Sequence, residues 1–251
     1  MNFHGILEKI IRFIMIQLKN WDNKTWLSSA SYINSFNLFL LKKKKLNKNS
    51  KILDIGCGRG KIIGSLSKKL KLSYKPIGID PVKHKDIDKF VDFRNEDIFK
   101  FFKSNQDKFD LIMIKQTLHF FNKDKRKRLI EICKDKLKIN GVLLILSLKT
   151  SNNEIPCFKL MKQKLNKGLK RDSIMLESTC KILKDFRIDK FQFKVSVTKK
   201  KYIKMLKQKY ISCLINLNSN QIDKGIKEIN YSYQKRINFN DTLESIQFRK
   251  I

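Results

Sequence analysis

The sequence is poor in acidic residues, glycine and proline, and it has no long apolar run. Only 23 Asp and Glu stand against 56 Lys and Arg in 251 residues, so the formal net charge is +33. Lys, Ile, Asn and Phe are residues of AT-rich codons, so a biased genome composition is a sufficient explanation for most of this charge. In either case such a surface attracts nucleic acids and anionic membranes at low salt.

The cysteines show no spacing that would hold a metal. They form no CxxC pair and no cluster with histidine, and their number is odd. We therefore expect reduced thiols, a cytoplasmic protein and no metal site. The five residues are Cys57, Cys133, Cys157, Cys180 and Cys213.

No segment has the pattern of a signal peptide or a membrane span. Residues 3–18 are apolar at helical spacing, but Glu8, Lys9 and Arg12 interrupt them, and they are too short to cross a bilayer. We expect an amphipathic helix that packs on the domain. Docking on a membrane surface is the alternative.

The chain is organised as one domain of the α/β class. Residues 1–50 predict an N-terminal helical cap, and strands and helices alternate over residues 51–150. Continuous apolar strands separated by helices predict a mostly parallel sheet with helices on both faces. Residues 151–251 predict the remainder of the sheet in the same domain. The elements expected there are helices over 158–165, 176–186, 202–217 and 220–230, and strands over 191–198 and 237–248.

Glycines at every second position follow the first predicted strand, at Gly56, Gly58 and Gly60. Such a turn at the carboxyl end of a parallel strand lets a nucleotide-type ligand approach the backbone. The dinucleotide fingerprint GxGxxG is not met, because Lys61 stands at the third glycine position. Asp54 before the turn would be awkward beside a pyrophosphate, but it suits a ligand with an ammonium group and no phosphate. S-adenosylmethionine is such a ligand.

The segment Asp54-x-Gly56-x-Gly58-x-Gly60 resembles the first motif of the seven-stranded (class I) S-adenosylmethionine-dependent methyltransferases. The likeness extends over residues 51–148. It implies a Rossmann-like sheet of seven strands and a helical lid inserted between the last strands, at residues 202–232. It also implies an enzyme that transfers a methyl group from S-adenosylmethionine.

The resemblance implies which residues bind the cofactor. Asp80 falls where the family binds the two ribose hydroxyls. Asp97 and Ile98 fall at the adenine, although Glu96 competes with Asp97, and capping a helix is the alternative role for Asp97. Asp110 is expected to be structural. The full expected set is Asp54, Gly56, Cys57, Gly58, Gly60, Asp80, Pro81, Asp97, Ile98, Lys115 and Gln116.

The segment "QTLHFFN" after the fourth strand resembles small-molecule methyltransferases related to the trans-aconitate and juvenile-hormone-acid enzymes. His119 is the candidate base for a hydroxyl acceptor, with simple packing as the alternative, whereas a carboxylate acceptor needs no base. The residues expected to line the acceptor site are Trp26, Tyr32, Tyr202, Lys209 and Tyr210. They suit a small anionic acceptor, although the helix at 202–217 could also be an ordinary amphipathic one.

Other functions remain as alternatives. An RNA (tRNA or rRNA) methyltransferase is favoured by the charge and by lysine clusters at 42–45, 125–128 and 199–201. The sequence lacks an Asn-Pro-Pro-aromatic segment that would clamp a flipped base, so we do not favour a nucleic-acid acceptor. A non-enzymatic relative and a nicotinamide-dependent oxidoreductase fit the motifs less well. A monomer or a homodimer would suit the size.

Overall fold

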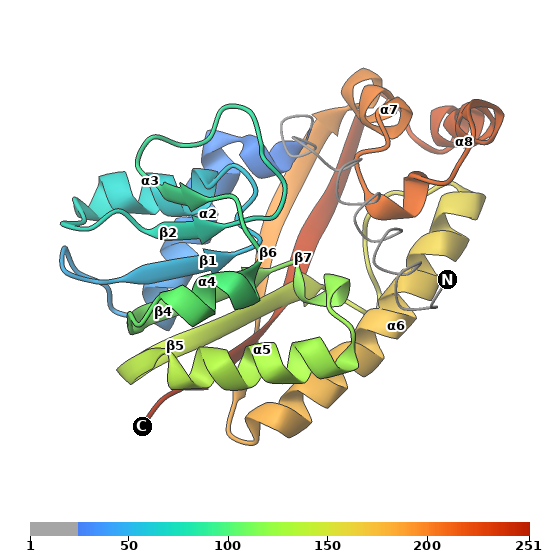
Figure 1. Ribbon diagram of the computed structural model, residues 1–251. Coiled ribbons are helices and arrows are strands. Elements are labelled where there is room, and N and C mark those ends of the chain that lie inside the picture. Colours follow the sequence, from blue (N-terminus) through green and yellow to red (C-terminus); the bar gives the residue numbers. More distant parts are fainter. Residues whose placement is uncertain (1–24) are drawn as a thin grey trace.

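The computed structural model describes residues 25–251, and one sheet forms its centre (Figure 1). The strand order is β3-β2-β1-β4-β5-β7-β6. β7 is antiparallel to both of its neighbours, and the other strands run parallel to one another, so the predicted seven-stranded sheet is mixed. The strands are β1 (Ile52–Ile55), β2 (Ile77–Ile79), β3 (Asp92–Arg94), β4 (Phe109–Lys115), β5 (Leu137–Leu148), β6 (Arg187–Thr198) and β7 (Arg236–Arg249).

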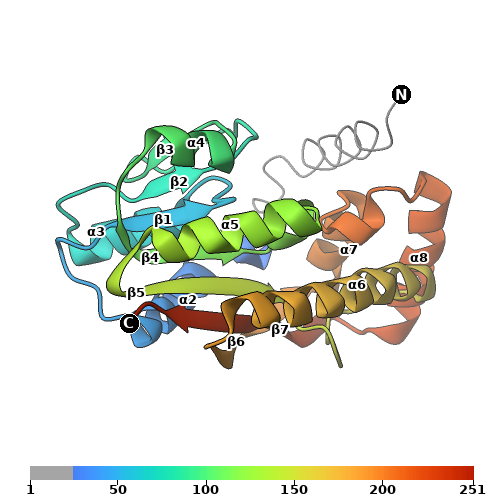
Figure 2. The same ribbon diagram turned by 60° about the horizontal axis from the view of Figure 1, so that its bottom comes forward.

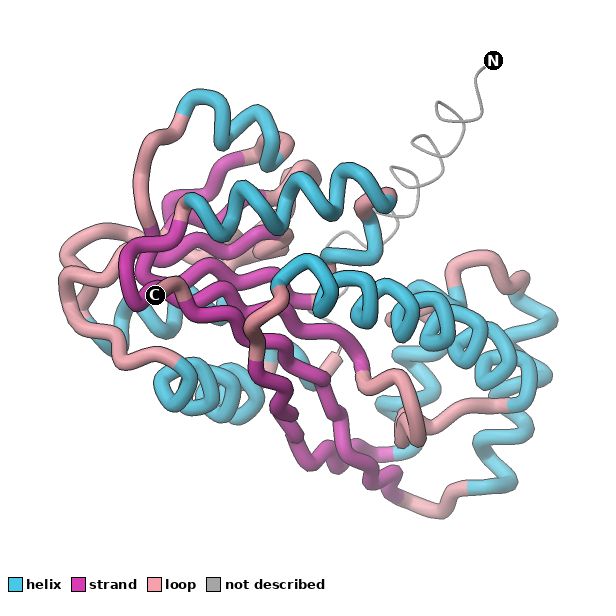
Figure 3. The backbone as a smooth tube through the Cα atoms, turned by 90° about the horizontal axis from the view of Figure 1, so that it is seen from below, coloured by secondary structure: helices cyan, strands magenta, loops and turns pink. Residues whose placement is uncertain are grey.

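Helices lie on both faces of the sheet (Figure 3). One face is covered by α2 (Ala30–Lys43) and α3 (Lys61–Leu70), and the other by α4 (Ile98–Ser104), α5 (Lys123–Asp135) and the second half of α6 (Lys159–Leu183). Strand side chains alternate between the two cores, which explains why apolar residues follow one another directly in the central strands, as in residues 111–114 and 142–146. The helix expected over residues 3–18 lies outside the described residues.

Three boundaries differ from the sequence prediction. The two helices expected at 158–165 and 176–186 form one helix, α6, because Leu165, Leu169 and Leu176 keep helical spacing across the polar middle. The dipeptide Asn140-Gly141 is typical of a turn, but it lies inside β5, where Asn140 has a φ of 61°. The helix expected at 202–217 is shorter and is replaced by α7 (Lys199–Lys207) and a 3-10 turn, η4 (Ser212–Leu214); α8 (Ser219–Ser232) follows.

β6 and β7 form a two-stranded extension of the sheet. They pair over their whole length, whereas β5 pairs with β7 only as far as Leu148 and Leu243. Residues 192–198 and 236–242 therefore reach beyond the carboxyl end of β5 and carry α7, η4 and α8 at their tip (Figure 1). The predicted helical insertion is present between the last two strands. No helix within residues 25–251 is long and apolar enough to cross a membrane.

Two glycines inside helices should respond to alanine in opposite directions. A Cβ on Gly225 of α8 would collide with the ring of Phe158, whereas a Cβ on Gly168 of α6 would meet no atom within 4 Å. We expect Gly225→Ala to lower the free energy of unfolding by about 1–3 kcal/mol through overpacking. Gly168→Ala should raise it by about 0.5–1 kcal/mol through helix propensity. Urea unfolding of both variants measures the difference, and a stabilising Gly225→Ala would contradict the packing of α8 on Phe158.

Candidate functional site

The turn after β1 is built from three glycines with left-handed backbone. The φ angles are 76° at Gly56, 55° at Gly58 and 69° at Gly60, a region that other residues enter only with strain. The backbone N–H groups of Gly56 and Cys57 donate to the carbonyl of Ile79, at 2.8 and 3.2 Å. The turn is thereby held against the end of β2, and Gly60 directly precedes α3.

The glycines differ in what surrounds them. A Cβ on Gly56 would collide with the side chain of Thr117, and a Cβ on Gly60 would lie 3.0 Å from Val91. A Cβ on Gly58 would meet nothing within 4 Å. Gly56 and Gly60 are therefore needed for packing, whereas Gly58 borders open space in which a ligand can approach the backbone.

The carboxylate of Asp80 is held beside this turn by backbone amides. Its Oδ2 accepts a hydrogen bond from the Gly58 N–H at 2.9 Å, and its Oδ1 accepts one from the Val82 N–H at 2.9 Å. His84 Nε2 lies 3.5 Å from Oδ1. The sequence analysis did not include His84. Its position four residues after Asp80 was the only available signal. Pro81, between them, is exposed.

Asp54, at the end of β1, is the most unusual group of the site. It is 4% exposed, and its Oδ1 has no hydrogen-bond partner among the described residues. Burial raises the pKa of Asp54 to about 7, the charge of Lys115 opposes this shift, and that of Asp80 adds to it. Because a buried carboxylate oxygen without a partner is costly, the arrangement favours a cationic group beside Asp54.

The residues predicted at the adenine lie at the start of α4. Asp97 is the N-cap of this helix, and its Oδ1 accepts from Phe99 N–H and Lys100 N–H at 2.8 and 3.3 Å. The alternative role of Asp97 as a helix cap is thus confirmed. Ile98 is buried. Glu96 is half-buried, so its carboxylate stays an alternative to Asp97 as the acceptor for the adenine amine.

The thiol of Cys57 packs beside β2. A Cβ on Gly78 would lie 2.7 Å from its Sγ, and burial raises the pKa of the thiol well above its usual value. Cys57 therefore contributes contact rather than a reactive thiolate.

Lys115 and Gln116 end β4 next to the aromatic face of α2. The Lys115 Nζ lies 5.6 Å from the ring of Tyr32 and 5.7 Å from that of Phe36, and it donates to Gln116 Oε1 at 3.1 Å. Gln116 has a φ of 53°. Tyr32 is fully buried, yet its hydroxyl has no hydrogen-bond partner among the described residues. An ammonium and an unpaired hydroxyl thus border the same aromatic cluster.

Asp241 of β7 completes this cluster, and the sequence analysis missed it. It is 2% exposed, and its Oδ2 accepts a hydrogen bond from Trp26 Nε1 at 2.7 Å. Burial raises the pKa of Asp241, and the Trp26 bond and the charge of Lys115 oppose the shift. Asp241 is an even number of residues from Ile237 and Leu243, and every second side chain of β7 faces inward. This alternation was the signal that the sequence offered.

Of the other predicted acceptor residues, Tyr210 packs directly against Trp26. The Tyr210 ring lies 5.7 Å from Trp26 and 5.8 Å from Tyr202. The Tyr202 hydroxyl lies 2.5 Å from the carbonyl of Pro156 and 2.8 Å from the Tyr210 hydroxyl. Lys209 has a φ of 51° and donates to the carbonyl of Ile215. Both tyrosines are buried and their polar groups are engaged within the protein, so they tie the insertion to the segment before α6.

His119 lies in a 3-10 turn, η3 (Leu118–Phe120), after β4. It is half-buried, and its ring lies 4.2 Å from that of Phe120. Burial lowers the pKa of His119, the charge of Asp172 on α6 opposes the shift, and Arg171 adds to it. The imidazole is therefore neutral at pH 7 and has a nitrogen that can accept a proton.

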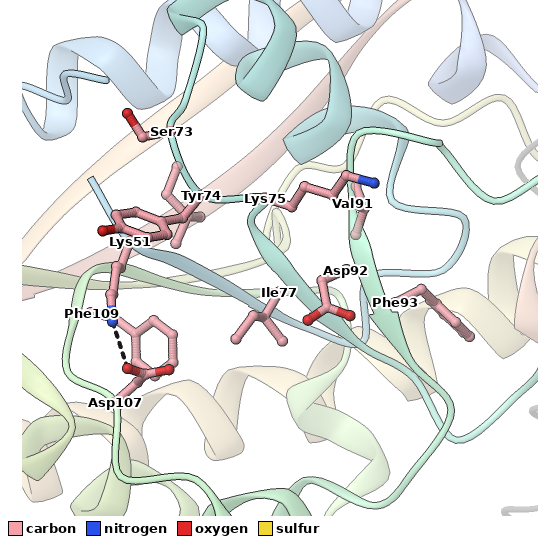
Figure 4. Close-up of a pocket in the computed structure, with 11 residues that line it drawn as sticks. Lys51, Ser73, Tyr74, Lys75, Ile77, Val91, Asp92, Phe93, Asp107 and Phe109 are labelled. Atoms are coloured by element: carbon pink, nitrogen blue, oxygen red, sulfur yellow. Dashed lines mark hydrogen bonds and ion pairs between the residues drawn. The ribbon is translucent and has the colours of Figure 1, made fainter. Parts of the chain in front are cut away.

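A pocket of about 510 Å³ lies at the opposite, amino-terminal edge of the sheet (Figure 4). Lys51, Tyr74, Ile77 and Phe109 line it, and a Lys51–Asp107 ion pair of 2.6 Å crosses its rim. It lies at the other end of β1 from the glycine turn and does not belong to this site.

Asp110 lies near the same edge of the sheet. Its carboxylate accepts from Lys51 N–H and from Lys138 Nζ, both at 2.7 Å, which confirms its structural role. No cluster of metal ligands occurs within residues 25–251.

Comparison with known proteins agrees with this geometry. Residues 52–141 match the family model described as a methyltransferase domain. No curated protein matches the chain. A putative methyltransferase from an antibiotic biosynthesis pathway of Anabaena variabilis has a similar structure, with a TM-score of 0.57, 14% identity, and coverage of 84% of this chain and 95% of that one. The N-methyltransferase NodS from Bradyrhizobium japonicum, in complex with S-adenosyl-L-homocysteine, gives a TM-score of 0.51 at 14% identity, covering 95% and 97% of the chains.

The two structures share the fold of this chain, and the family match falls on the segment that carries Asp54, the glycine turn, Asp80 and Lys115. The predicted relation to the trans-aconitate group has no match among them. The chain carries a methyltransferase domain over residues 52–141, and the protein is a methyltransferase.

Proposed function

We propose that the enzyme methylates a small anionic acceptor that binds between the end of β4 and the aromatic residues of α2. The observation that carries this proposal is the pair of buried, unpartnered oxygens on Asp54 of β1 and Tyr32 of α2, with Lys115 of β4 near both. One oxygen favours a cation and the other borders an ammonium group. The site therefore suits a cationic donor beside an anionic acceptor.

The residues around the glycine turn fit S-adenosylmethionine. The unpaired Asp54 oxygen would bind the ammonium of its methionine end, and the open space over Gly58 would admit its body. Asp80 would accept from the ribose hydroxyls with the lone pairs that Gly58 and Val82 leave free. Glu96 or the second oxygen of Asp97 would accept from the adenine amine, with Ile98 beside the ring.

The acceptor site would be enclosed and positive. Lys115 and the Tyr32 hydroxyl would hold a carboxylate or a similar anion, and Trp26 would close the site because Asp241 fixes its indole. We propose that the helical insertion covers the acceptor as a lid. Tyr202, Tyr210 and Lys209 would hold this lid in place without contacting the acceptor directly. An enclosed site of this kind admits a small molecule, in line with the biosynthetic role stated for the Anabaena protein.

Bound S-adenosylmethionine supplies an electrophilic methyl group on a sulfonium. The chain contributes by aligning the acceptor with that methyl and by excluding water. A carboxylate acceptor would need no base. For a hydroxyl acceptor, the neutral His119 would take the proton. An RNA methyltransferase is the second candidate, and the charge of +33 favours it.

Incubation with methyl-labelled S-adenosylmethionine and host-cell extract tests the proposed acceptor class. We expect label in a small, RNase-resistant fraction, in which the product can be identified by mass. Label that is lost on RNase treatment would replace the small-molecule proposal with the RNA one. Thermal protection by NAD and not by S-adenosylmethionine would overturn the cofactor assignment.

Cofactor binding should depend on pH through Asp54. Its pKa is raised to about 7 in the free protein, and pairing with an ammonium favours the ionised carboxylate. Affinity should therefore rise as pH increases from 5.5 to 7.5 and then level off. At pH 6 binding should release roughly nine-tenths of a proton, and at pH 8 almost none. Calorimetry in buffers of different ionisation enthalpy measures the release.

Asp54→Asn should remove both the pH dependence and the proton release, and it should weaken binding. Asp110→Asn at the opposite edge of the sheet serves as the matched control and should retain all three. The same Asp54 titration destabilises the free protein as pH rises through the window between its unfolded pKa and 7. A wild-type affinity that is constant from pH 5.5 to 8 would contradict the assignment.

Removing the hydroxyl of Tyr32 should affect acceptor binding, whereas removing that of Tyr210 should mainly affect stability. In Tyr32→Phe the acceptor loses a hydrogen bond while the fold loses none, so we expect a several-fold rise in the extract concentration needed for half-maximal labelling and unchanged cofactor affinity. Tyr210→Phe breaks the pair with Tyr202 and should cost about 1 kcal/mol of stability with a smaller effect on that concentration. Equal loss of cofactor affinity in Tyr32→Phe would show that Tyr32 is misplaced.

A further inference from the structure

Two acid-free stretches of the chain are rich in basic residues. Residues 155–171 and 190–222 together contain 14 Lys and Arg and no Asp or Glu, whereas residues 25–154 contain 29 basic and 13 acidic residues. The basic residues are Lys159, Lys162, Lys164, Lys167, Lys170, Arg171, Lys190, Lys194, Lys199, Lys200, Lys201, Lys204, Lys207 and Lys209.

The fold brings the two stretches together around α8. We call residues 159–171 and 199–232 the basic lobe. Phe158, before α6, faces Gly225 of α8, and the Lys159 N–H donates to Glu228 Oε2 at 2.7 Å. On the other side, Lys199 Nζ donates to the carbonyls of Asn230 and Tyr233. Figure 2 shows α6, α7 and α8 at one end of the molecule, away from β1 and α3.

Most cations of the basic lobe project into solvent without an acidic partner. On α6, Lys162, Lys164, Lys167 and Lys170 are exposed and form no ion pair with any residue from 25 to 251. Lys164, Lys167 and Lys170 follow one another every three residues, about 4.5 Å apart along the helix axis, whereas Lys162 lies two residues before Lys164 on another side of the helix. The exposed lysines of α7, which also lack an ion pair among the described residues, are Lys200, Lys201, Lys204 and Lys207.

An exposed aromatic ring accompanies these charges. Tyr231 of α8 is 96% exposed, and Lys224 and Lys227 lie seven and four residues before it on the same helix face. The basic lobe exposes no large aliphatic side chain, as an anionic membrane surface would require for insertion. A flat ring between lysines suits a stacked base.

We propose that the basic lobe binds a single-stranded nucleic acid, with its lysines on successive phosphates and Tyr231 against a base. A small acceptor could meet only one or two of these charges, whereas a phosphodiester chain meets a row of them. The lobe lies beyond the carboxyl edge of the sheet, on the same side as the glycine turn. This binding goes beyond the proposed function and does not require that the nucleic acid be methylated.

The test is fluorescence anisotropy of labelled 20-nucleotide RNA and DNA strands with the full chain, from 50 to 200 mM salt and without methyl donor. The lobe variant is Lys162→Gln/Lys167→Gln/Lys170→Gln/Lys204→Gln. The matched control is Lys42→Gln/Lys45→Gln/Lys48→Gln/Lys75→Gln, which removes the same charge from exposed lysines near the opposite edge. Both variants should retain the melting temperature of the wild type.

We expect the lobe variant to lose at least tenfold in affinity at 100 mM salt and to flatten the slope of log K against log salt by about 3, since each contact to a single strand contributes about 0.7. The control should change the slope by less than 1. Tyr231→Ala should weaken binding at least fivefold without changing the slope. The RNA and DNA arms show which sugar is preferred.

Equal losses in the lobe and control variants would overturn the proposal, because the attraction would then come from overall charge alone. Sedimentation with vesicles of phosphatidylcholine and phosphatidylserine measures membrane binding. Vesicle binding that is lost in the lobe variant, together with no binding of either oligonucleotide, would also overturn the proposal. Because no methyl donor is present, the outcome is independent of the acceptor's identity. Failure here would leave the labelling experiment on the small acceptor intact.

Discussion

The buried carboxylate of Asp54 is the group on which the arrangement of the site depends. A carboxylate that is 4% exposed and has an unpaired oxygen is unfavourable unless positive charge lies nearby. Lys115, one strand away, supplies part of that charge, and it acts on Asp241 of β7 as well. Asp241 in turn holds the indole of Trp26. One electrostatic requirement at the end of β1 is thus linked, through β4 and β7, to the segment that closes the acceptor side.

This linkage gives the extension of β6 and β7 a role in the site as well as in the fold. Asp241 lies in the part of β7 that reaches past the end of β5, and the same extension carries the helical insertion. The hydroxyls of Tyr202 and Tyr210 fasten the insertion to Pro156. A movement of the insertion would therefore also displace Trp26, because its ring packs against Tyr210.

The sequence was sufficient for the features that are local in the chain. The glycine turn after the first strand, Asp54 before it and the alternation of strands and helices over residues 51–150 depend on neighbouring residues, and the structure has all three. Contacts across long separations could not be read in this way. Trp26 and Asp241 are 215 residues apart, and only the register of β7 brings them together. The hydroxyl partners of Tyr202 and Tyr210 likewise depend on packing.

Positive charge has two physically distinct settings in this protein. At Lys115 a single half-buried ammonium lies beside aromatic rings, where a lower dielectric would strengthen its interaction with the anionic acceptor that we propose. On the basic lobe the charges are exposed and repeated, so each is weak in water and binding strength requires many phosphates at once. A site of the first kind selects a small acceptor. A surface of the second kind holds a polymer without selecting what is methylated, so recognition of a macromolecule and methyl transfer can be separate properties of one chain.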